Sequence, residues 1–282
     1  MAERILDVAN LQISLPTPAG TLYAVHGINL HVDRGETLCI VGESGCGKSL
    51  TALSIMDLLP NKARRTADKL ELDGTSILNI GERRMADLRG NRMGMIFQEP
   101  MSSLNPAYTI GNHLEEAMLR HRRVTRAEAR ERAIYLLDRV GITGAESRLK
   151  QYPHQLSGGL RQRIMIALAL MCGPDLVIAD EPTTALDVTI QAQILYLLAE
   201  LQREFDIGLV LITHDLGIVA RVADRVAVMY AGQIVELGTA QQVFRAPTHP
   251  YTQGLLNCIP MPGKIHRGAR LGQIPGIVPS LI

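Results

Sequence analysis

An apolar run that leads directly into a glycine-rich loop constrains this chain more than any other feature of its sequence. The run is Thr37-Leu-Cys-Ile-Val41, and the loop that follows it is Gly42-Glu-Ser-Gly-Cys-Gly-Lys-Ser49. A strand without apolar–polar alternation is typical of a parallel sheet that helices cover on both faces. In such folds, ligands bind at the loop that leaves the strand. The sequence therefore predicts an α/β fold with a ligand site at residues 42–49.

The composition of this loop indicates a phosphate site. Its glycines let backbone N–H groups point into one concave surface, and the helix expected from Lys48 adds the partial positive charge of its N-terminus. The spacing G-x-x-x-x-G-K-[ST] assigns the Lys48 ammonium to the β- and γ-phosphates and the Ser49 hydroxyl to Mg²⁺. We favour this interpretation over a turn that merely joins a strand to a helix. The expected nucleotide contacts are Gly42, Glu43, Ser44, Gly45, Cys46, Gly47, Lys48, Ser49 and Leu50.

Composition argues against several other functions. The 282 residues include 29 Lys+Arg and 28 Asp+Glu, so no basic excess favours a nucleic-acid partner. Aromatic residues make up only 4%, which leaves little surface for stacking on single strands. The four cysteines form no C-x-x-C pair, so we expect reduced thiols and no metal site in a cytosolic protein. The charged N-terminus and the lack of a long apolar run predict a soluble chain without a secretory signal.

Hydrophobic patterning divides the chain into regions. Alternating stretches at residues 5–8, 11–15 and 28–32, with turn signals at Pro16, residues 18–20 and residues 33–35, predict an antiparallel set of strands. Helical periods over residues 109–171 predict an inserted helical subdomain, with a capping box at Thr125. We also expect a helix at 49–59, buried strands at 93–97, 176–179, 209–212 and 226–229, and a hairpin at 232–238. Beyond Phe244 the composition turns to Pro, Gly and His, and packed helices are not expected there.

Two carboxylates end the strand at residues 176–179. In a protein with a phosphate loop, Asp180 in this position can hold the Mg²⁺ coordination shell, and Glu181 can polarise the attacking water. Alone, the pair could be two solvated acids that begin a loop, but after an intact phosphate loop the catalytic interpretation is favoured. His214, at the end of the strand at 209–212, is expected to contact the γ-phosphate.

A second helix N-terminus has the features of an anion site. Ser157 is a good N-cap, and Gly158 and Gly159 free backbone N–H groups at the start of an apolar helix. Since one chain rarely needs two such sites, we expect this one to meet a phosphate bound by another copy or by a partner. Two chains would then clamp nucleotide between them.

Taken together, these motifs resemble the ATPases of ATP-binding-cassette (ABC) transporters. The matching features are the Walker A loop at 42–49, the Q-loop glutamine Gln98, the signature motif at 156–162, the Walker B strand ending in Asp180-Glu181, the D-loop at 185–187 and the switch His214. The resemblance covers about residues 5–245, and we expect an ABC nucleotide-binding domain, or cassette, at residues 1–245. It implies an ABC ATPase fold of the P-loop NTPase class. That fold has a RecA-like parallel-sheet core, an N-terminal antiparallel β-subdomain and a helical subdomain at about 105–170.

The resemblance also implies roles for individual residues. Gln98 would link the nucleotide to the membrane-domain contact and, with Ser49 and Asp180, organise Mg²⁺; Glu181 and His214 would place the attacking water. Ser157, Gly158 and Gly159 would grip the γ-phosphate of the opposing subunit, and Asp187 would lie at the dimer seam. ATP and Mg²⁺ are the implied cofactors.

Two positions depart from the family pattern. The signature usually reads LSGGQ, whereas Leu160 occupies its fifth position here; because Ser157 and both glycines remain, we expect clamping to survive. The family also stacks an aromatic residue on adenine shortly before the phosphate-loop strand. Tyr23 is the nearest candidate, although an ungapped alignment puts the usual position near Ala19, and a tyrosine with no ligand role is the alternative.

The end of the chain indicates a subfamily. The segment Thr248-His-Pro-Tyr-Thr-Gln253 and the stretch at residues 98–106 resemble the ATPases of oligopeptide, dipeptide and nickel importers. The extension at 246–282 is the region peculiar to them. In some members it continues into a cysteine-rich stretch with an iron–sulfur cluster. With only Cys258 nearby, such a cluster is expected here only if the natural chain continues past Ile282.

From this resemblance we expect an ATPase subunit that powers peptide import from the cytoplasmic face of the bacterial inner membrane. Its expected partners are a second ABC ATPase subunit, identical or paralogous, two transmembrane permease subunits and, indirectly, a solute-binding protein outside the membrane. Alternatives are a nickel, metallophore or glutathione importer ATPase, or an ABC ATPase that acts on nucleic acid or the ribosome. The last is disfavoured because the chain has one cassette and no heptad run.

Overall fold

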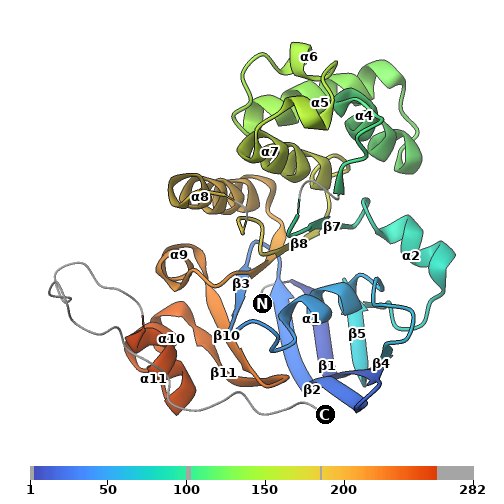
Figure 1. Cartoon of the computed structure of the whole chain (residues 1–282). Coiled ribbons are helices and arrows are strands. Elements are labelled where there is room, and N and C mark those ends of the chain that lie inside the picture. Colours follow the sequence, from blue (N-terminus) through green and yellow to red (C-terminus); the bar gives the residue numbers. More distant parts are fainter. Residues whose placement is uncertain (1–2, 100–102, 185, 259–282) are drawn as a thin grey trace, which may run out of the picture. The chain divides into compact units, whose positions relative to one another are not determined.

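The computed structural model describes residues 3–99, 103–184 and 186–258. The chain divides into two units, one made of Met1–Leu78 with Leu211–Ile282 and the other of Asn79–Val210. Strand β9 (Gly208–Ile212) crosses from the second unit into the first. The elements of both units are labelled in Figure 1.

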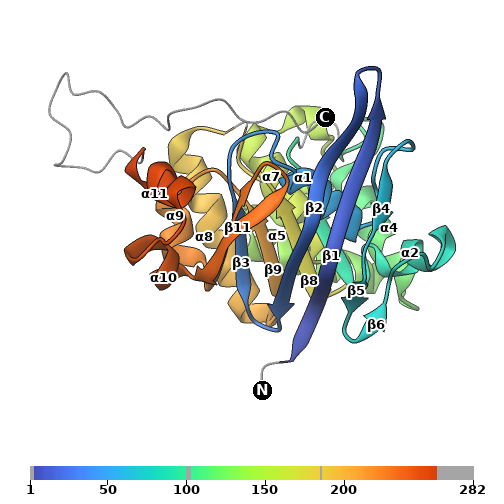
Figure 2. The same cartoon turned by 90° about the horizontal axis from the view of Figure 1, so that it is seen from below.

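A long antiparallel hairpin begins the first unit. Strands β1 (Arg4–Thr17) and β2 (Gly20–Asp33) run side by side along their whole length, as Figure 2 shows. The other edge of β1 pairs with β4 (Arg64–Thr66) and β5 (Lys69–Leu72), and β5 pairs with β6 (Thr75–Ser76). This arrangement confirms the predicted antiparallel set of strands.

The turn at Pro16 that was expected to separate short strands in this region is absent from β1 and β2, and a bulge interrupts β1 instead. Pro16 does not end a strand but pairs with Thr21 inside the hairpin. It is tolerated because β4 covers the other edge of β1 only from Gln12 to Ser14, so no ladder bond from Pro16 is needed there. Between Val8 and Leu11 the register shifts by a bulge, and Asn10 there has φ +50°. The short strands expected at 5–8 and 11–15 are therefore one long, bulged strand, β1, and the strand expected at 28–32 is part of β2.

The parallel strands of the first unit are β3 (Thr37–Val41), in which every residue is buried, and β10 (Arg225–Tyr230). β10 continues into an antiparallel partner, β11 (Gln233–Thr239), which confirms the predicted hairpin. Two polar contacts fix the start of β3 against β10. The Thr37 N–H donates to Asp224 at 2.8 Å, and Arg225 pairs with Glu36 at 3.0 Å.

The described part of the first unit also contains the helices α1 (Lys48–Ile55), α9 (Leu216–Val222), α10 (Ala240–Arg245) and α11 (Pro250–Asn257). Helix α1 is shorter than the predicted 49–59, because the chain turns at Asp57, which has φ +53°, before Pro60 is reached. The expectation of no packed helix beyond Phe244 is wrong. Helix α11 buries Tyr251 and Thr252, and Figure 1 draws it beside α10.

In the described part of the second unit, strands β7 (Met93–Ile96) and β8 (Leu176–Asp180) pair in parallel. Their neighbours in sequence are α2 (Glu82–Leu88) and α8 (Val188–Phe205). Between the strands lie α4 (Ile110–His121), α5 (Arg126–Arg139), α6 (Ala145–Arg148), the 3₁₀ turn η1 (Pro153–Gln155) and α7 (Gly158–Ala169). The helices and strands predicted for this part of the sequence are confirmed.

Local capping explains where the helices begin. The Thr125 hydroxyl accepts from the Glu128 N–H at 3.2 Å, and the Glu128 carboxylate accepts from the Thr125 N–H, which is the predicted capping box. Helices α4, α5 and α7 pack on one another.

The boundaries of the cassette at 1–245, the helical subdomain at 105–170 and the extension at 246–282 stay predictions. Within the described ranges, no helix has the length and apolar character that crossing a membrane requires.

The close approach of β7 to α7 gives a test of the packing in the second unit. A Cβ added at Gly94 would lie 2.7 Å from the Ala169 carbonyl oxygen, so Gly94→Ala should reduce the free energy of unfolding by about 1–3 kcal/mol. Urea unfolding followed by circular dichroism measures this change. Gly238→Ala is the control, because its nearest atom belongs to the flexible Gln242 side chain. Equal stability of the two variants would contradict the packing described for β7.

Candidate functional site

The phosphate loop predicted at residues 42–49 lies between β3 and α1 in the first unit. Two of its glycines have no room for a side chain. Gly42 has φ +153°, and a Cβ there would lie 2.1 Å from the Met229 carbonyl oxygen in β10; Gly47 has φ +106°, and its Cβ would lie 2.5 Å from the Ala24 carbonyl oxygen in β2. The loop therefore passes directly against the backbones of two strands, which only glycine permits.

Lys48 is buried at the start of α1, and its ammonium points back across the loop. It donates to the carbonyl oxygens of Gly42 at 2.9 Å and of Glu43 at 2.8 Å. Ser44 and Gly45 are exposed at the tip, whereas Glu43, Ser49 and Leu50 are half-buried. The loop thus combines a held cation, an exposed glycine-rich tip and a helix N-terminus, which together suit an anionic phosphate chain.

Cys46 is part of the loop but has no redox character in this environment. Its side chain is buried. Burial raises the pKa of the Cys46 thiol, and the nearby Lys48 only partly opposes that shift. The thiol is therefore neutral near pH 7 and packs as a small apolar group.

Tyr23 lies on β2 with 52% of its surface exposed, and its ring centroid is 5.9 Å from that of His26. Its neighbour Ala24 is the residue whose carbonyl meets the phosphate loop at Gly47. Ala19, the other candidate position, is exposed in the turn between β1 and β2. The Tyr23 ring is exposed, and its role in binding adenine stays a prediction.

His214 follows β9 and is exposed just before α9 in the first unit. Its carbonyl oxygen accepts from the Leu216 N–H at 3.2 Å. The next residue, Asp215, caps α9 by accepting from the Ile218 N–H at 3.1 Å. These bonds fix the backbone of the turn that carries the His214 side chain, whose contact with a γ-phosphate stays a prediction.

In the second unit the structure brings Gln98 and Glu181 together. The Gln98 side-chain amide lies 3.5 Å from Glu181 Oε2, and the Thr184 hydroxyl donates to the same oxygen at 3.0 Å. Glu181 has φ +43°, an uncommon conformation for a residue with a side chain and one that clusters at functional sites. The structure thus holds the Glu181 carboxylate by two polar side chains at the end of β8.

Asp180 and Glu181 have different environments although they are adjacent. Asp180 is the last residue of the fully buried strand β8, with 6% of its surface exposed. Glu181 is half-buried in the turn that follows. One carboxylate is fixed in the core and the other stands at its edge, which suits the predicted division between holding a cation and accepting a proton from water.

The signature residues start α7. The Ser157 hydroxyl accepts from the Leu160 N–H at 3.4 Å, so Ser157 is the N-cap that the sequence predicted. This bond uses the backbone of Leu160, and the departure from the family pattern at this position leaves the cap intact. Gly158 and Gly159 form the first turn.

Asp187 lies close to these glycines. A Cβ on Gly158 would meet Leu186 at 3.3 Å, and a Cβ on Gly159 would meet Ile190 at 3.2 Å, so the start of α7 packs against the start of α8. The Asp187 carboxylate accepts from the Ile190 N–H at 3.0 Å and caps α8. The signature and the D-loop, distant in sequence, therefore form one surface region of the second unit.

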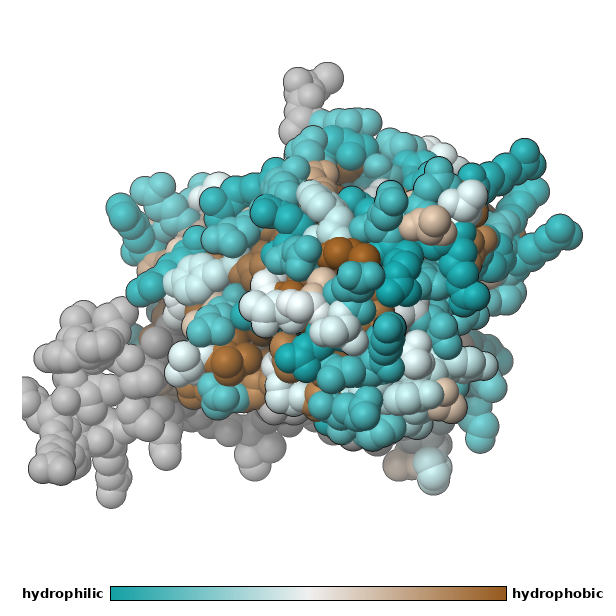
Figure 3. Space-filling view, turned by 90° about the horizontal axis from the view of Figure 1, so that it is seen from above, coloured by the Kyte–Doolittle hydropathy of each residue, from teal (hydrophilic) through white to brown (hydrophobic). Residues whose placement is uncertain are grey.

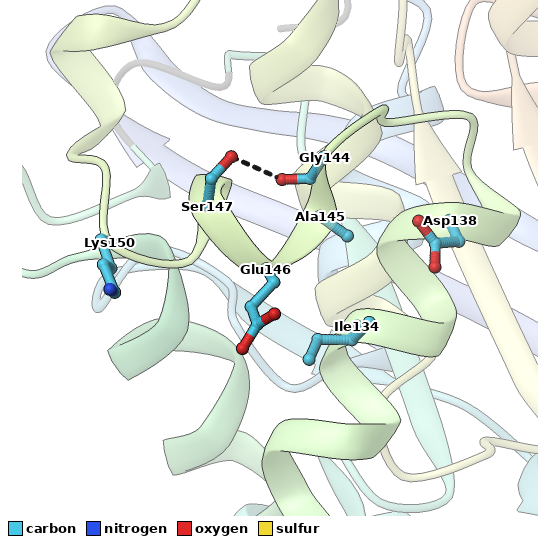
Figure 4. A pocket seen from close by; sticks show the side chains of 7 residues that line it. All are labelled: Ile134, Asp138, Gly144, Ala145, Glu146, Ser147 and Lys150. Atoms are coloured by element: carbon cyan, nitrogen blue, oxygen red, sulfur yellow. Dashed lines mark hydrogen bonds between the residues drawn. The ribbon is translucent and has the colours of Figure 1, made fainter.

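Three hollows on the described surface of the second unit lie away from these residues. The first, with a volume of about 660 Å³, is drawn in Figure 4 and is open to solvent beside α5 and α6. It is lined by Ile134, Asp138, Gly144, Ala145, Glu146, Ser147 and Lys150. Two further hollows of about 490 and 540 Å³ lie beside α4 and the start of α5.

Hydrophilic residues dominate the face in Figure 3, with apolar residues only in small separate patches.

Comparison with known proteins places this geometry in a family. Residues 25–184 match the model of the ABC transporter family, and residues 235–282 match the oligopeptide/dipeptide transporter C-terminal region. The dipeptide transport ATP-binding protein DppD of Bacillus subtilis is 51% identical over 280 residues, which cover 99% of this chain and 83% of the relative. The oligopeptide transport ATP-binding protein OppD of Salmonella typhimurium is 49% identical over 281 residues, 100% of this chain and 83% of the relative.

The chain belongs to the ABC transporter family.

Solved structures agree with this assignment. A dimeric, post-hydrolysis state of the ATP-binding cassette MJ0796 with ADP and Pi matches with a TM-score of 0.75 and 27% identity, over 84% of this chain and 99% of that one. The protein cbiO1 of Clostridium perfringens, part of the ABC transporter complex cbiONQ, matches with a TM-score of 0.72 and 29% identity, over 86% of this chain and 92% of that one. The family and the ABC ATPase fold predicted from the motifs are confirmed, and the chain is an ATP-binding ATPase subunit.

Sequence reasoning missed two features of this ABC ATPase. Thr184, which holds Glu181, follows it by three residues and had no motif to mark it. Tyr251 was noted only as part of the family tail, yet its hydroxyl accepts from the Glu43 N–H at 3.1 Å in the phosphate loop. Residues 100–102 and 259–282 of the matched stretches, and Ala185 of the predicted D-loop, lie outside the described residues.

Substitution of Asp187 distinguishes its role as the N-cap of α8 from its proposed role at a dimer seam. Asp187→Ala should lower the free energy of unfolding of the ABC ATPase by about 1 kcal/mol, because α8 loses its N-cap, whereas Asp187→Ser should retain most of that stability. Thermal unfolding of the purified chain measures both variants. If Asp187 also serves at a dimer seam, both should weaken ATP-dependent dimerisation, measured by sedimentation. Equal stability of Asp187→Ala and the unsubstituted chain would contradict the capping role.

Proposed function

We propose that this ABC ATPase powers the import of dipeptides or oligopeptides. The observation that carries the proposal is the combination, in one chain, of the ABC cassette at residues 25–184 and the peptide-transporter C-terminal region at 235–282. Relatives named for dipeptide and oligopeptide transport are about half identical to it along nearly its whole length. The cargo itself is selected by other subunits, so the proposal concerns the class of transporter.

ATP binding is assigned to the loop at Gly42–Ser49 and residue Leu50. The buried ammonium of Lys48, now bonded to two loop carbonyls, would exchange these for oxygens of the β- and γ-phosphates. The N–H groups at the start of α1 would add their partial positive charge. Tyr23 would stack on the adenine.

Hydrolysis is assigned to the carboxylate of Glu181. It would accept the proton of a water in line with the γ-phosphate, since a general base must lie within hydrogen-bond reach of that water. The bonds from Gln98 and Thr184 to Oε2 support this role, because they orient the carboxylate. His214 would contact the γ-phosphate and respond to its loss.

The residues proposed for Mg²⁺ have suitable chemistry. Ser49, Gln98 and Asp180 offer a hydroxyl, an amide oxygen and a carboxylate, and hard oxygen donors of this kind are what Mg²⁺ prefers. Asp180 is fixed in the core at the end of β8, as expected of a residue in a cation's coordination shell. The ion would neutralise charge on the β- and γ-phosphates.

The region formed by the signature and Asp187 is proposed to face a second ATPase subunit. Ser157, Gly158 and Gly159 would contact the γ-phosphate held by that subunit, and Asp187 would lie at the seam. The packing of Gly158 and Gly159 against Leu186 and Ile190 supports one shared surface. The second subunit is a copy or a paralogue. Two permease subunits would hold the pair at the cytoplasmic face, and a solute-binding protein would deliver the peptide.

Replacement of the proposed base is the sharpest test of hydrolysis. Glu181→Gln should lower kcat for ATP by roughly 10²–10⁴-fold, the usual contribution of a general base, and should leave ATP affinity nearly unchanged. Phosphate release and isothermal titration calorimetry measure the two quantities. Glu146→Gln, at an exposed carboxylate in the same unit, is the matched control. Undiminished turnover by Glu181→Gln would remove Glu181 from this role.

Reconstitution tests the transport proposal. The chain is reconstituted in proteoliposomes with the second ATPase subunit and the two permease subunits. It should hydrolyse ATP faster when a peptide-loaded binding protein is added, and labelled peptide should accumulate across the membrane. The Glu181→Gln variant should abolish both signals. If ATP hydrolysis by the isolated chain is rapid and the permeases and peptide leave it unchanged, coupling to peptide import is contradicted.

A further inference from the structure

The tail segment that precedes α11 is held in place by one carboxylate. Glu236, on β11, accepts from the Thr248 N–H at 2.8 Å, from the Thr248 hydroxyl at 3.0 Å and from the His249 N–H at 3.1 Å. Partial burial raises the pKa of the Glu236 carboxyl, but these hydrogen bonds outweigh burial and the net pKa is lowered. The carboxylate is therefore ionised near pH 7 and fixes residues 248–249 against the sheet.

The first turn of α11 is built by its own residues. The ring nitrogen Nδ1 of His249 accepts from the Tyr251 N–H at 3.1 Å, so His249 is the N-cap. Pro250 occupies the first helical position, where its missing N–H costs nothing. The Gln253 side chain donates back to the Pro247 carbonyl at 2.9 Å. These local bonds set the direction of the Tyr251 side chain.

Tyr251 is buried and reaches the phosphate loop. Its ring packs against that of Tyr230, with centroids 4.4 Å apart, and its hydroxyl accepts from the Glu43 N–H at 3.1 Å. Burial raises the pKa of Tyr251 to about 12, so the hydroxyl is neutral at any physiological pH. The contact is permanent with respect to pH and joins residues that are 208 apart in the sequence.

The peptide unit between Gly42 and Glu43 is held at both of its edges. Its carbonyl oxygen, that of Gly42, accepts from Lys48 at 2.9 Å, and its N–H, that of Glu43, donates to Tyr251. A rotation of this peptide plane would break both bonds. It would also shift the Lys48 ammonium from the position that it holds before a phosphate binds. The plane therefore links the tail to the lysine proposed to bind phosphate.

We propose that Tyr251 is a positioning residue for the phosphate loop, and that the tail segment 248–253 sets ATP affinity through it. The inference rests on the proposed role of Gly42–Ser49 in nucleotide binding. It gives the region that distinguishes peptide-transporter ATPases a physical function inside the nucleotide site. Tyr251 acts on Lys48 and the loop and does not touch the reacting atoms.

Removal of one hydroxyl tests this inference. Tyr251→Phe keeps the ring on Tyr230 and should raise KM and Kd for MgATP about fivefold, the factor that one neutral hydrogen bond corresponds to, with kcat within about twofold of the unsubstituted chain. Kd is measured by calorimetry on the full chain, and KM and kcat in the reconstituted transporter. Tyr230→Phe, which removes the hydroxyl of the other ring in the pair, is the matched control and should leave KM unchanged.

A second variant tests the path from the tail. Glu236→Gln weakens the bonds to Thr248 and His249 and should also raise Kd for MgATP, and its effect should be absent when Tyr251 is already phenylalanine. Additive effects would contradict transmission through Tyr251. A Kd for Tyr251→Phe equal to that of the unsubstituted chain would overturn the proposal, provided that thermal unfolding shows a folded variant.

Lys48→Ala separates this inference from the proposed site. If Lys48→Ala loses ATP binding while Tyr251→Phe retains it unchanged, the tail proposal fails and the phosphate-loop assignment stands. If Lys48→Ala binds MgATP as tightly as the unsubstituted chain, the assignment of the loop fails, and with it the proposal for Tyr251.

Discussion

The loop that follows β3 depends on the absence of a side chain at Gly42. Its backbone passes so close to β10 that a Cβ would lie 2.1 Å from the Met229 carbonyl oxygen, a distance that no side chain can occupy. Because the loop starts against β10, the next peptide plane lies within reach of Lys48 on one side and of Tyr251 on the other. One steric constraint thus determines where the proposed phosphate ligand, the helix N-terminus and the tail meet.

A second local constraint separates the two carboxylates at the end of β8. An extended strand would simply alternate consecutive side chains between its faces, but the positive φ of Glu181 turns the chain at once. Asp180 remains in the core, and Glu181 reaches the bonds from Gln98 and Thr184. Holding a residue with a side chain in this conformation costs of order 1–3 kcal/mol, which the surrounding contacts must offset. The strain is placed where the proposed chemistry needs a fixed base.

The features that could be predicted from the sequence are those determined by residues close to one another in the chain. The unbroken apolar runs of β3 and β8, the glycine pattern at 42–47 and the caps at Thr125 and Ser157 are local signals, and the structure has them as expected. The continuous β1 and the helix α11 were not predicted. Pro16 is harmless only because β4 ends before it, and α11 is held by Glu236 from twelve residues away. Such outcomes depend on partners that no short window of sequence contains.

The contact between Tyr251 and the phosphate loop is more specific than a simple tether of the tail would require. A tether requires only chain connectivity, whereas Tyr251 is buried, packed against Tyr230 and bonded to a backbone N–H of the phosphate loop. Its neutral hydroxyl does not titrate near pH 7, so a change in the position of α11, and not a change of pH, alters the bond. That position depends on the carboxylate of Glu236, which lies on the strand that continues from β10. A displacement of β11 or of the tail would therefore reach the loop through one hydrogen bond, and the affinity for ATP would respond while the catalytic groups stay in place.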